Sequence, residues 1–183
     1  MIYVFLADGF EELEAVACID LLRRAGLPVT TVAVGCTERM VTGSHQIRLE
    51  ADRLETQAKF ADLSAVVLPG GKTGVQGLEA SGVVRDAVRY CLENGRPVAA
   101  LCAAPSILGH MGVLKGKRAT CFPGFEQELE GAQVCGDSVC VDGRILTGKG
   151  AGVSVDFALR LVEMLCGGEQ AQKLGMTIQC RNM

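Results

Sequence analysis

Cys102 stands where the chain could present a reactive thiol. Residues 98–101 are apolar, and Cys102 is followed by Ala103, Ala104 and Pro105. This order predicts a strand, a sharp turn and a helix, with the sulfur at the turn, because proline suits the first turn of a helix. The amides and the positive potential of a helix N-terminus favour a thiolate. A cysteine buried in the core is the alternative, but the position after a strand favours a nucleophile.

A glycine pair follows another apolar segment. Gly70 and Gly71 come directly after residues 65–68. Glycines at such a place let a ligand approach the backbone, and their amides can form an oxyanion pocket, although an ordinary turn is the alternative. Neighbouring parallel strands would bring this pair close to Cys102.

Glu14 is a carboxylate on the apolar side of a predicted helix over residues 11–25. The residues that follow it at helical spacing are all apolar: Ala17, Cys18, Leu21, Leu22 and Ala25. Burial would raise the pKa of Glu14 and make it a general acid or base near neutral pH. Charge at a helix N-terminus is the alternative, and it explains Glu11 and Glu12 well.

The remaining titratable residues give no triad and no metal site. His110 lies eight residues after Cys102, which is about 12 Å along a helix, and His45 could reach the thiol only through folding or from a second subunit. The chain has nine cysteines but no CxxC pair. We therefore expect reduced thiols, no bound metal and no Cys–His–acid peptidase site.

Short apolar segments alternate with helical patterns along the chain. This alternation predicts one α/β domain over residues 1–183, with a doubly wound, mostly parallel sheet between helices. The helix over 82–94 begins after Ser81, and Ser154 is the predicted cap of the helix to Cys166. The expected strands cover residues 2–7, 29–34, 46–51, 65–68, 98–101, 118–121, 133–135, 138–141 and 144–147, and the other helices cover 105–111 and 168–174.

Composition narrows the classes of function. The chain has 183 residues, 49% of them hydrophobic, a net charge of -3 and no tryptophan, so a nucleic-acid groove is not expected. The first apolar segment ends at Asp8, too short for a membrane span and without a basic leader. We expect a cytoplasmic protein with no membrane association.

Taken together, five motifs resemble the ThiJ/PfpI superfamily, in the branch that contains DJ-one and its bacterial relatives. The motifs occur in family order across nearly the whole chain. They are Ala7-Asp8-Gly9-Phe10-Glu11-Glu12-Leu13-Glu14-Ala15, Asp20-Leu21-Leu22-Arg23-Arg24-Ala25-Gly26, Val67-Leu68-Pro69-Gly70-Gly71, Ala99-Ala100-Leu101-Cys102-Ala103-Ala104-Pro105 and Thr147-Gly148-Lys149-Gly150-Ala151-Gly152.

The resemblance implies a flavodoxin-like sandwich, of the class I glutamine amidotransferase type, and a homodimer. It implies that Cys102 oxidises readily to a sulfinate, that a protonated Glu14 steadies it, and that Gly71 and Ala103 supply oxyanion amides. The activities it implies are a glyoxalase that needs no glutathione, deglycation of early glyoxal adducts, and holdase-type chaperoning.

Some positions depart from the family pattern. Phe122 stands before Pro123 where many members have histidine, although some bacterial members also have phenylalanine. Ala151 replaces a proline, and His45 stands where a basic residue reaches toward the partner's pocket. Ala103 follows the cysteine where the peptidase branch has histidine, which argues against that branch.

We therefore predict an enzyme in which Cys102 adds to the aldehyde of methylglyoxal or of a glycated adduct. Glu14 would move the protons, and Gly70, Gly71, Ala103 and Phe122 would line the site. No cofactor is needed. The alternative is a redox-sensing stress protein or holdase chaperone that uses the same thiol without turnover.

Overall fold

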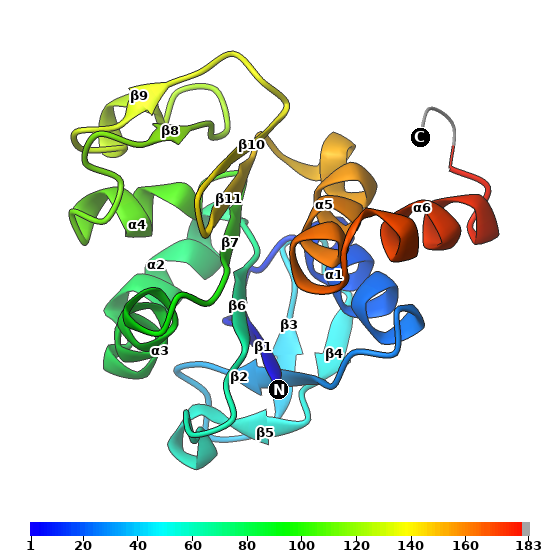
Figure 1. Cartoon of the computed structure of the whole chain (residues 1–183). Coiled ribbons are helices and arrows are strands. Elements are labelled where there is room, and N and C mark those ends of the chain that lie inside the picture. The colour runs from blue at the N-terminus through cyan, green and yellow to red at the C-terminus, as the bar shows by residue number, and fades with distance from the viewer. Residues whose placement is uncertain (181–183) are drawn as a thin grey trace.

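A seven-stranded sheet forms the centre of the computed structural model, which describes residues 1–180 (Figure 1). Its strand order is β10-β11-β7-β6-β1-β2-β5, and all neighbours pair in parallel except β10 with β11. The strands are β1 (Ile2–Leu6), β2 (Val29–Ala33), β5 (Arg53–Leu54), β6 (Ala65–Leu68), β7 (Val98–Leu101), β10 (Val139–Asp142) and β11 (Ile145–Gly148).

Helices cover both faces of this sheet (Figure 1). On one face lie α1 (Glu12–Arg24), α5 (Ser154–Cys166) and α6 (Gly168–Thr177). On the other lie α2 (Lys72–Ala80), α3 (Gly82–Glu93) and α4 (Pro105–His110). The prediction of a doubly wound, mostly parallel sheet between helices is confirmed.

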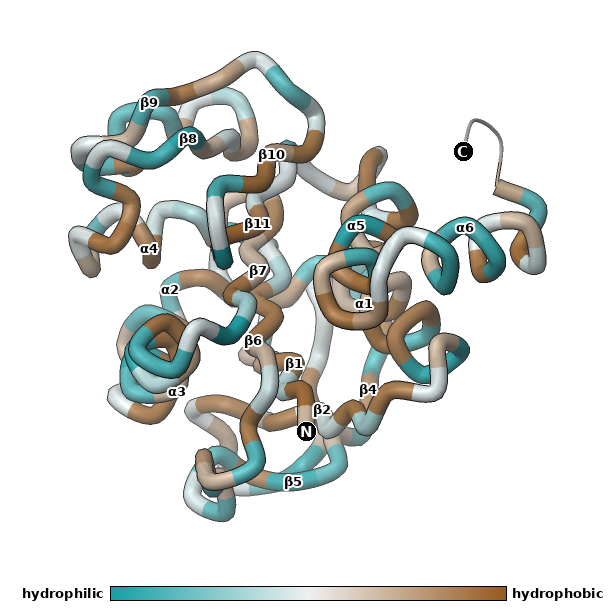
Figure 2. Tube along the Cα trace, viewed as in Figure 1, coloured by the Kyte–Doolittle hydropathy of each residue, from teal (hydrophilic) through white to brown (hydrophobic). Residues whose placement is uncertain are grey.

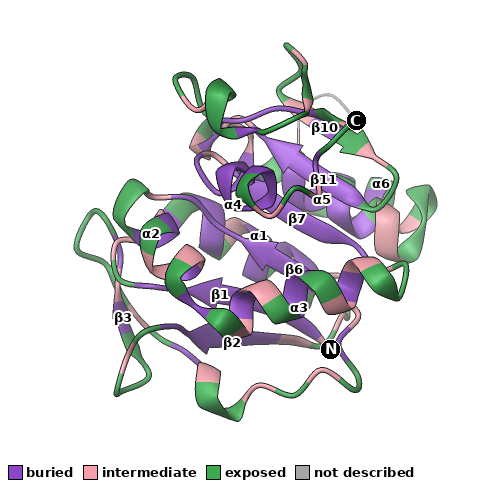
Figure 3. Ribbon diagram, turned by 90° about the vertical axis from the view of Figure 1, so that its left-hand side faces the viewer, coloured by how far each residue is buried: buried purple, intermediate pink, exposed green. Residues whose placement is uncertain are grey.

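The sheet divides the hydrophobic core into two layers, as strand geometry requires. Tyr3 and Phe5 of β1 pack with the α2, α3 and α4 side, whereas Ile2, Val4 and Leu6 pack with the α1, α5 and α6 side. Figure 2 shows the central strands as largely hydrophobic, and Figure 3 shows them buried beneath helices whose outer faces are exposed. Burial on both faces explains why these strands read as continuous apolar segments.

Two small sheets lie outside the central one. The antiparallel pair β3 (Met40–Thr42) and β4 (Arg48–Glu50) forms a hairpin, and β8 (Arg118–Ala119) pairs in parallel with β9 (Gln133–Val134). Short 3-10 segments occur at Glu55–Gln57, Glu126–Glu128 and Ala151–Val153. Among residues 1–180, no helix has both the length and the apolar character needed to cross a membrane.

Most predicted elements match the structure, but some were missed. The sequence did not predict α2 or the short strands β3 and β5. Ser154 is not the cap of α5: it is the first helical residue, and its hydroxyl donates to the carbonyl of Ala151, 2.8 Å away. The Ser81 cap is confirmed, because its hydroxyl accepts from the amide of Val84.

The strand order reverses between β1 and β6. The chain runs from β1 outward to β2 and β5, then returns to β6 and continues outward on the other side to β7 and β11. Ligands of doubly wound sheets bind beyond the carboxyl ends of the strands at such a reversal. Glu14, Gly70 and Cys102 follow the ends of β1, β6 and β7 respectively.

Candidate active site

Cys102 occupies a strained turn between β7 and α4. Its φ is 62°, in the left-handed region that non-glycine residues rarely adopt, at a cost of about 1–3 kcal/mol. Backbone hydrogen bonds hold this conformation: the Cys102 amide donates to the carbonyl of Gly148 (2.9 Å), and its carbonyl accepts from the amide of Phe122 (2.8 Å). The turn presents the sulfur beyond the end of β7, as in a nucleophile elbow.

Glu14 is completely buried on α1, in the apolar stripe from which its burial was predicted. The amide of Gly70 donates to its Oε2 (2.7 Å), while Oε1 has no hydrogen-bond partner by distance and angle among the described residues. Burial, with a smaller effect of the Glu11 charge, raises the pKa of Glu14 to about 7, and the Gly70 amide and the Cys102 thiol oppose that rise. Glu14 can therefore hold or release a proton near neutral pH.

Gly70 brings the carboxyl and the thiol together because it has no side chain. A Cβ placed on Gly70 would lie 2.5 Å from Cβ of Cys102, 2.7 Å from Oε2 of Glu14 and 3.1 Å from Sγ of Cys102. The next residue, Gly71, has a φ of 91° and caps the N-terminus of α2. Both glycines are therefore required by geometry.

The surroundings of the Cys102 sulfur correct one expectation. Burial, the charge of Glu14 and their hydrogen bond raise the pKa of Cys102 to about 12, while the amides of Gly71 and Ala103 lower it. The expected thiolate-favouring effect of the helix N-terminus is thus outweighed, because the thiol is partly buried beside an acid. When Glu14 carries the proton, its charge no longer opposes thiolate formation.

The amides of Gly71 and Ala103 face this sulfur from two different loops. They come from the turns after β6 and β7, neighbouring strands of the sheet. Two backbone donors converging on a nucleophile can also stabilise an oxygen that becomes negatively charged on an attached carbon.

Phe122 forms a wall of the site. A Cβ atom added to Gly150 would lie 3.2 Å from the Phe122 ring and 3.9 Å from the Cys102 sulfur, so the ring and the sulfur flank the same glycine. The side chain is 47% exposed. A phenyl ring transfers no proton, so of these two neighbours of the thiol only Glu14 carries a group that could act as an acid or base.

The structure pairs each histidine with carboxylates. His45 is exposed, and its Nδ1 lies 3.0 Å from Oε2 of Glu12. His110 contacts Glu79 through Nδ1 and Glu128 through Nε2 (2.9 Å for the second pair). These carboxylates raise the pKa values of both histidines.

Sequence reasoning missed the role of Glu12. The side chain is buried and accepts from the amide of His45 (2.6 Å), the Ser44 hydroxyl (3.1 Å) and the amide of Ile47 (3.4 Å). Burial opposes ionisation, but the hydrogen bonds, chiefly from His45, lower the pKa of Glu12 to about 2. Glu12 therefore fastens the turn of the β3–β4 hairpin, and no sequence signal separated it from an ordinary acid at a helix N-terminus.

A hollow of about 460 Å³ adjoins the site at the start of α2. Neither Cys102 nor Glu14 lines it. Its lining residues are Asp8, Gly9, Thr42, Gly43, Ser44, Gln46, Lys72 and Thr73. Glu11, Glu12 and His45 also bring ligand atoms within 4.8 Å of one another, but the hydrogen bonds to Glu12 already occupy its oxygens.

The fold and the site define a flavodoxin-like α/β protein with a cysteine at a nucleophile elbow. Residues 1–164 match the DJ-1/PfpI family, and the chain belongs to that family. Protein dj-1beta of Drosophila melanogaster is 35% identical over 173 residues, which cover 93% of this chain and 92% of the fly protein. The structure of oxidized DJ-1 from Toxoplasma gondii superposes with a TM-score of 0.94 at 30% identity, covering 99% of this chain and 98% of that one.

Two other relatives bear on how far the likeness extends. Protein DJ-1 homolog B of Arabidopsis thaliana is 37% identical over 174 residues, which cover 94% of this chain but 40% of the plant protein, so this chain spans about two fifths of that relative. A Caenorhabditis elegans protein named glutathione-independent glyoxalase DJR-1.2 is 28% identical over 169 residues, covering 91% of this chain and 89% of the worm protein.

Proposed function

We propose that this protein is a cysteine-dependent glyoxalase or deglycase acting on methylglyoxal or on adducts derived from glyoxals. The observation that carries the proposal is the environment of the Cys102 sulfur, which meets the Glu14 carboxyl and the amides of Gly71 and Ala103. The name of the C. elegans relative supports the reaction class. The proposed chemistry uses side chains and backbone only, without a cofactor.

The reaction begins when the Cys102 thiolate attacks the aldehyde carbon of methylglyoxal, and the carbonyl oxygen takes a proton to give a hemithioacetal. Glu14 then removes the proton from the former aldehyde carbon, and a proton returns to the neighbouring carbon through an enediol. The resulting lactoyl thioester reacts with one water, which releases lactate and restores the thiol. The amides of Gly71 and Ala103 stabilise the oxygen that becomes negative in these steps.

The test is methylglyoxal consumption without glutathione, with D- and L-lactate measured. We expect lactate from the wild type and loss of at least about a hundredfold in kcat/KM for Cys102→Ser and Glu14→Gln, the scale of a lost acid–base group. Cys166→Ser, which removes an exposed thiol on α5, is the matched control and should retain activity. Wild-type protein that is inert with its thiols reduced would contradict the glyoxalase.

A preformed adduct separates a deglycase from a glyoxalase. Methylglyoxal incubated with N-acetylcysteine gives a hemithioacetal that releases free methylglyoxal at a measurable rate. A deglycase forms lactate faster than this release, whereas a glyoxalase cannot exceed it.

The same thiol supports a second candidate, a redox-sensing stress protein or holdase chaperone. Cys102 is partly accessible, and the amides that face its sulfur could equally hold the oxygens of a sulfinate. Suppression of client aggregation that appears on oxidation and is lost in Cys102→Ser would favour the sensor. Suppression that survives this substitution would favour a holdase independent of the thiol.

We further propose that the protein is a cytoplasmic homodimer. Two apolar residues of α1 are exposed to solvent, Leu13 (65%) and Val16 (46%). Met40 and Ile47 are also exposed, on the neighbouring hairpin. Exposed apolar residues that lie near one another favour an interface. Free thiols, among them Cys18, Cys91 and Cys166, fit a reducing compartment, which imaging of a fluorescent fusion would test.

A further inference from the structure

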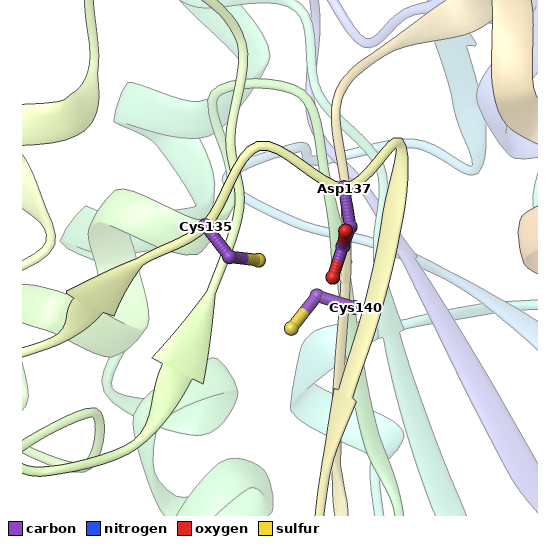
Figure 4. Close-up of side chains that lie close together, drawn as sticks. All are labelled: Cys135, Asp137 and Cys140. Carbon is purple, nitrogen blue, oxygen red and sulfur yellow. The ribbon is translucent and has the colours of Figure 1, made fainter.

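Cys135, Asp137 and Cys140 form a cluster that the proposed chemistry does not use. Cys135 follows β9, Asp137 lies in the connecting loop, and Cys140 belongs to β10. Figure 4 shows their side chains gathered around one common space, with both sulfur atoms and the carboxylate directed toward it. One ligand atom from each residue lies within 4.8 Å of the other two.

These donors suit a zinc-class divalent cation. Thiolates bind zinc at about 2.3 Å and carboxylate oxygens at about 2.0–2.2 Å, in tetrahedral geometry. Two sulfur ligands of one tetrahedral zinc ion are therefore about 3.8 Å apart. Ligand atoms already within 4.8 Å of one another need only small side-chain rotations to reach this geometry.

The backbone positions of both cysteines are fixed by hydrogen bonds. The amide of Cys135 donates to the carbonyl of Ala119 (2.9 Å), and Cys140 pairs opposite Thr147 in the β10–β11 ladder. Cys140 is buried, Cys135 is partly buried and Asp137 is exposed. One side of the cluster therefore faces solvent, which gives an ion a path of entry and a water a place to complete its coordination.

Arg118 supplies an outer partner for the carboxylate. Its Nη2 donates to Oδ2 of Asp137, which leaves Oδ1 available to an ion. Metal-binding carboxylates are commonly oriented by such outer hydrogen bonds. The guanidinium also offsets the negative charge that two thiolates and a carboxylate leave around a divalent cation. Arg118 thus orients the site and balances its charge.

We propose that Cys135, Asp137 and Cys140 bind a zinc-class divalent cation, with a fourth position open to water. This proposal revises the sequence-based expectation that the chain holds no metal. That expectation rested on the scarcity of histidines and the lack of a CxxC pair. The spacing Cys-x-Asp-x-x-Cys lies outside familiar zinc patterns, and only the fold brings its three donors together.

Cobalt(II) is a direct probe, because thiolate ligands give it a charge-transfer absorption in the near ultraviolet. The reduced wild-type protein, kept in a phosphine reductant without oxygen, should bind one cobalt ion with this absorption and lose the signal when zinc(II) is added. In Cys135→Ser and Asp137→Asn we expect affinity to fall by about tenfold or more, since loss of even an outer partner has effects of this size. Circular dichroism checks that Cys140→Ser, which alters a buried strand residue, still folds.

Two matched controls locate the ion. Cys166→Ser removes an exposed thiol and Cys102→Ser removes the elbow thiol, and both should keep the wild-type cobalt signal. A signal lost in Cys102→Ser but kept in Cys135→Ser would place the ion at the elbow and overturn the proposal. A reduced wild type that binds no cobalt would also overturn the proposal, and a disulfide formed by peroxide between Cys135 and Cys140 would then identify the pair as a redox couple.

Discussion

The proposed reaction depends on the acid–base behaviour of two residues, Glu14 and Cys102. Burial raises the pKa of both groups, so each holds its proton to a higher pH than it would in water. Two coupled groups titrate as a unit. A thiolate therefore forms most easily while Glu14 is protonated. The protonation state of the carboxyl thus controls the ionisation of the thiol.

The pH dependence of the free energy of unfolding, compared between the wild type and Glu14→Gln, tests whether Glu14 holds this proton. The pKa of Glu14 rises from 4.5 to about 7 on folding, so in this window the folded protein binds more protons than the unfolded chain, and stability falls as pH rises. Over the full titration of Glu14, this rise in pKa corresponds to about 3 kcal/mol in the free energy of unfolding. Urea unfolding at pH 5 and pH 8 should show a smaller fall in the free energy of unfolding for Glu14→Gln than for the wild type.

Asp20→Asn is the control for this measurement. Asp20 lies on the same helix but is exposed, so its loss should leave the wild-type pH dependence unchanged. Both histidines are present in all three proteins, so their contribution to the pH dependence of stability cancels in the comparison. An undiminished fall in Glu14→Gln would mean that this carboxyl is not the buried acid.

Gly70→Ala tests whether close packing assembles the site. The new methyl group would meet Cβ of Cys102 at 2.5 Å and Oε2 of Glu14 at 2.7 Å, so one of them must move. We expect about 1–3 kcal/mol of destabilisation, typical of overpacking, and loss of methylglyoxal turnover. Gly152→Ala is the matched control, since nothing lies within 4 Å of its added methyl. Equal activity in both variants would contradict the proposed geometry.

At the scale of elements, the junctions after β1, β6 and β7 were largely predictable, and α2 was not. Strand ends followed from apolar segments that stop at polar or glycine residues, and Glu14 was visible as an acid in an apolar stripe. Helix α2 contains Gly74 and Gly77, which lower helix propensity. Added Cβ atoms there would meet the Phe10 backbone and the Ala7 side chain at 2.8 Å. Tertiary packing, which a local pattern does not contain, therefore selects these glycines.

The attachment of the β3–β4 hairpin to α1 gives a prediction at this scale. Glu12→Ala removes the acceptor of the His45 and Ile47 amides. Hydrogen bonds to a charged group contribute about 1.5–3 kcal/mol, so these amides should exchange with solvent at least about tenfold faster. Hydrogen exchange at pH 7 measures this, with exposed Glu38→Ala as the control. Unchanged exchange in Glu12→Ala would show that the strands alone hold the turn.

At the scale of the whole molecule, strand–helix alternation was sufficient to predict a doubly wound sheet, because parallel strands between helices are buried on both faces and are therefore continuously apolar. It could not give the strand order, which follows from how the chain returns from β5 to β6. That return creates the reversal between β1 and β6 where Glu14 and Gly70 meet. The cluster of Cys135, Asp137 and Cys140 was hidden for a related reason, since local patterns do not show how the loop between β9 and β10 brings its members together.

Association of two copies is the prediction that belongs to the whole molecule. Leu13 and Val16 are exposed one helical turn apart on α1, beside a hairpin that exposes Met40 and Ile47. If this surface is the proposed dimer interface, light scattering on eluting protein should give about twice the 19.3 kDa of one chain. Leu13→Asp and Val16→Asp should shift the protein to a monomer, because a buried unpaired charge opposes association. Met176→Asp alters an equally exposed apolar residue on α6 and should remain a dimer. A wild type that is monomeric at micromolar concentration, or a Leu13→Asp variant that stays dimeric, would remove α1 as the interface.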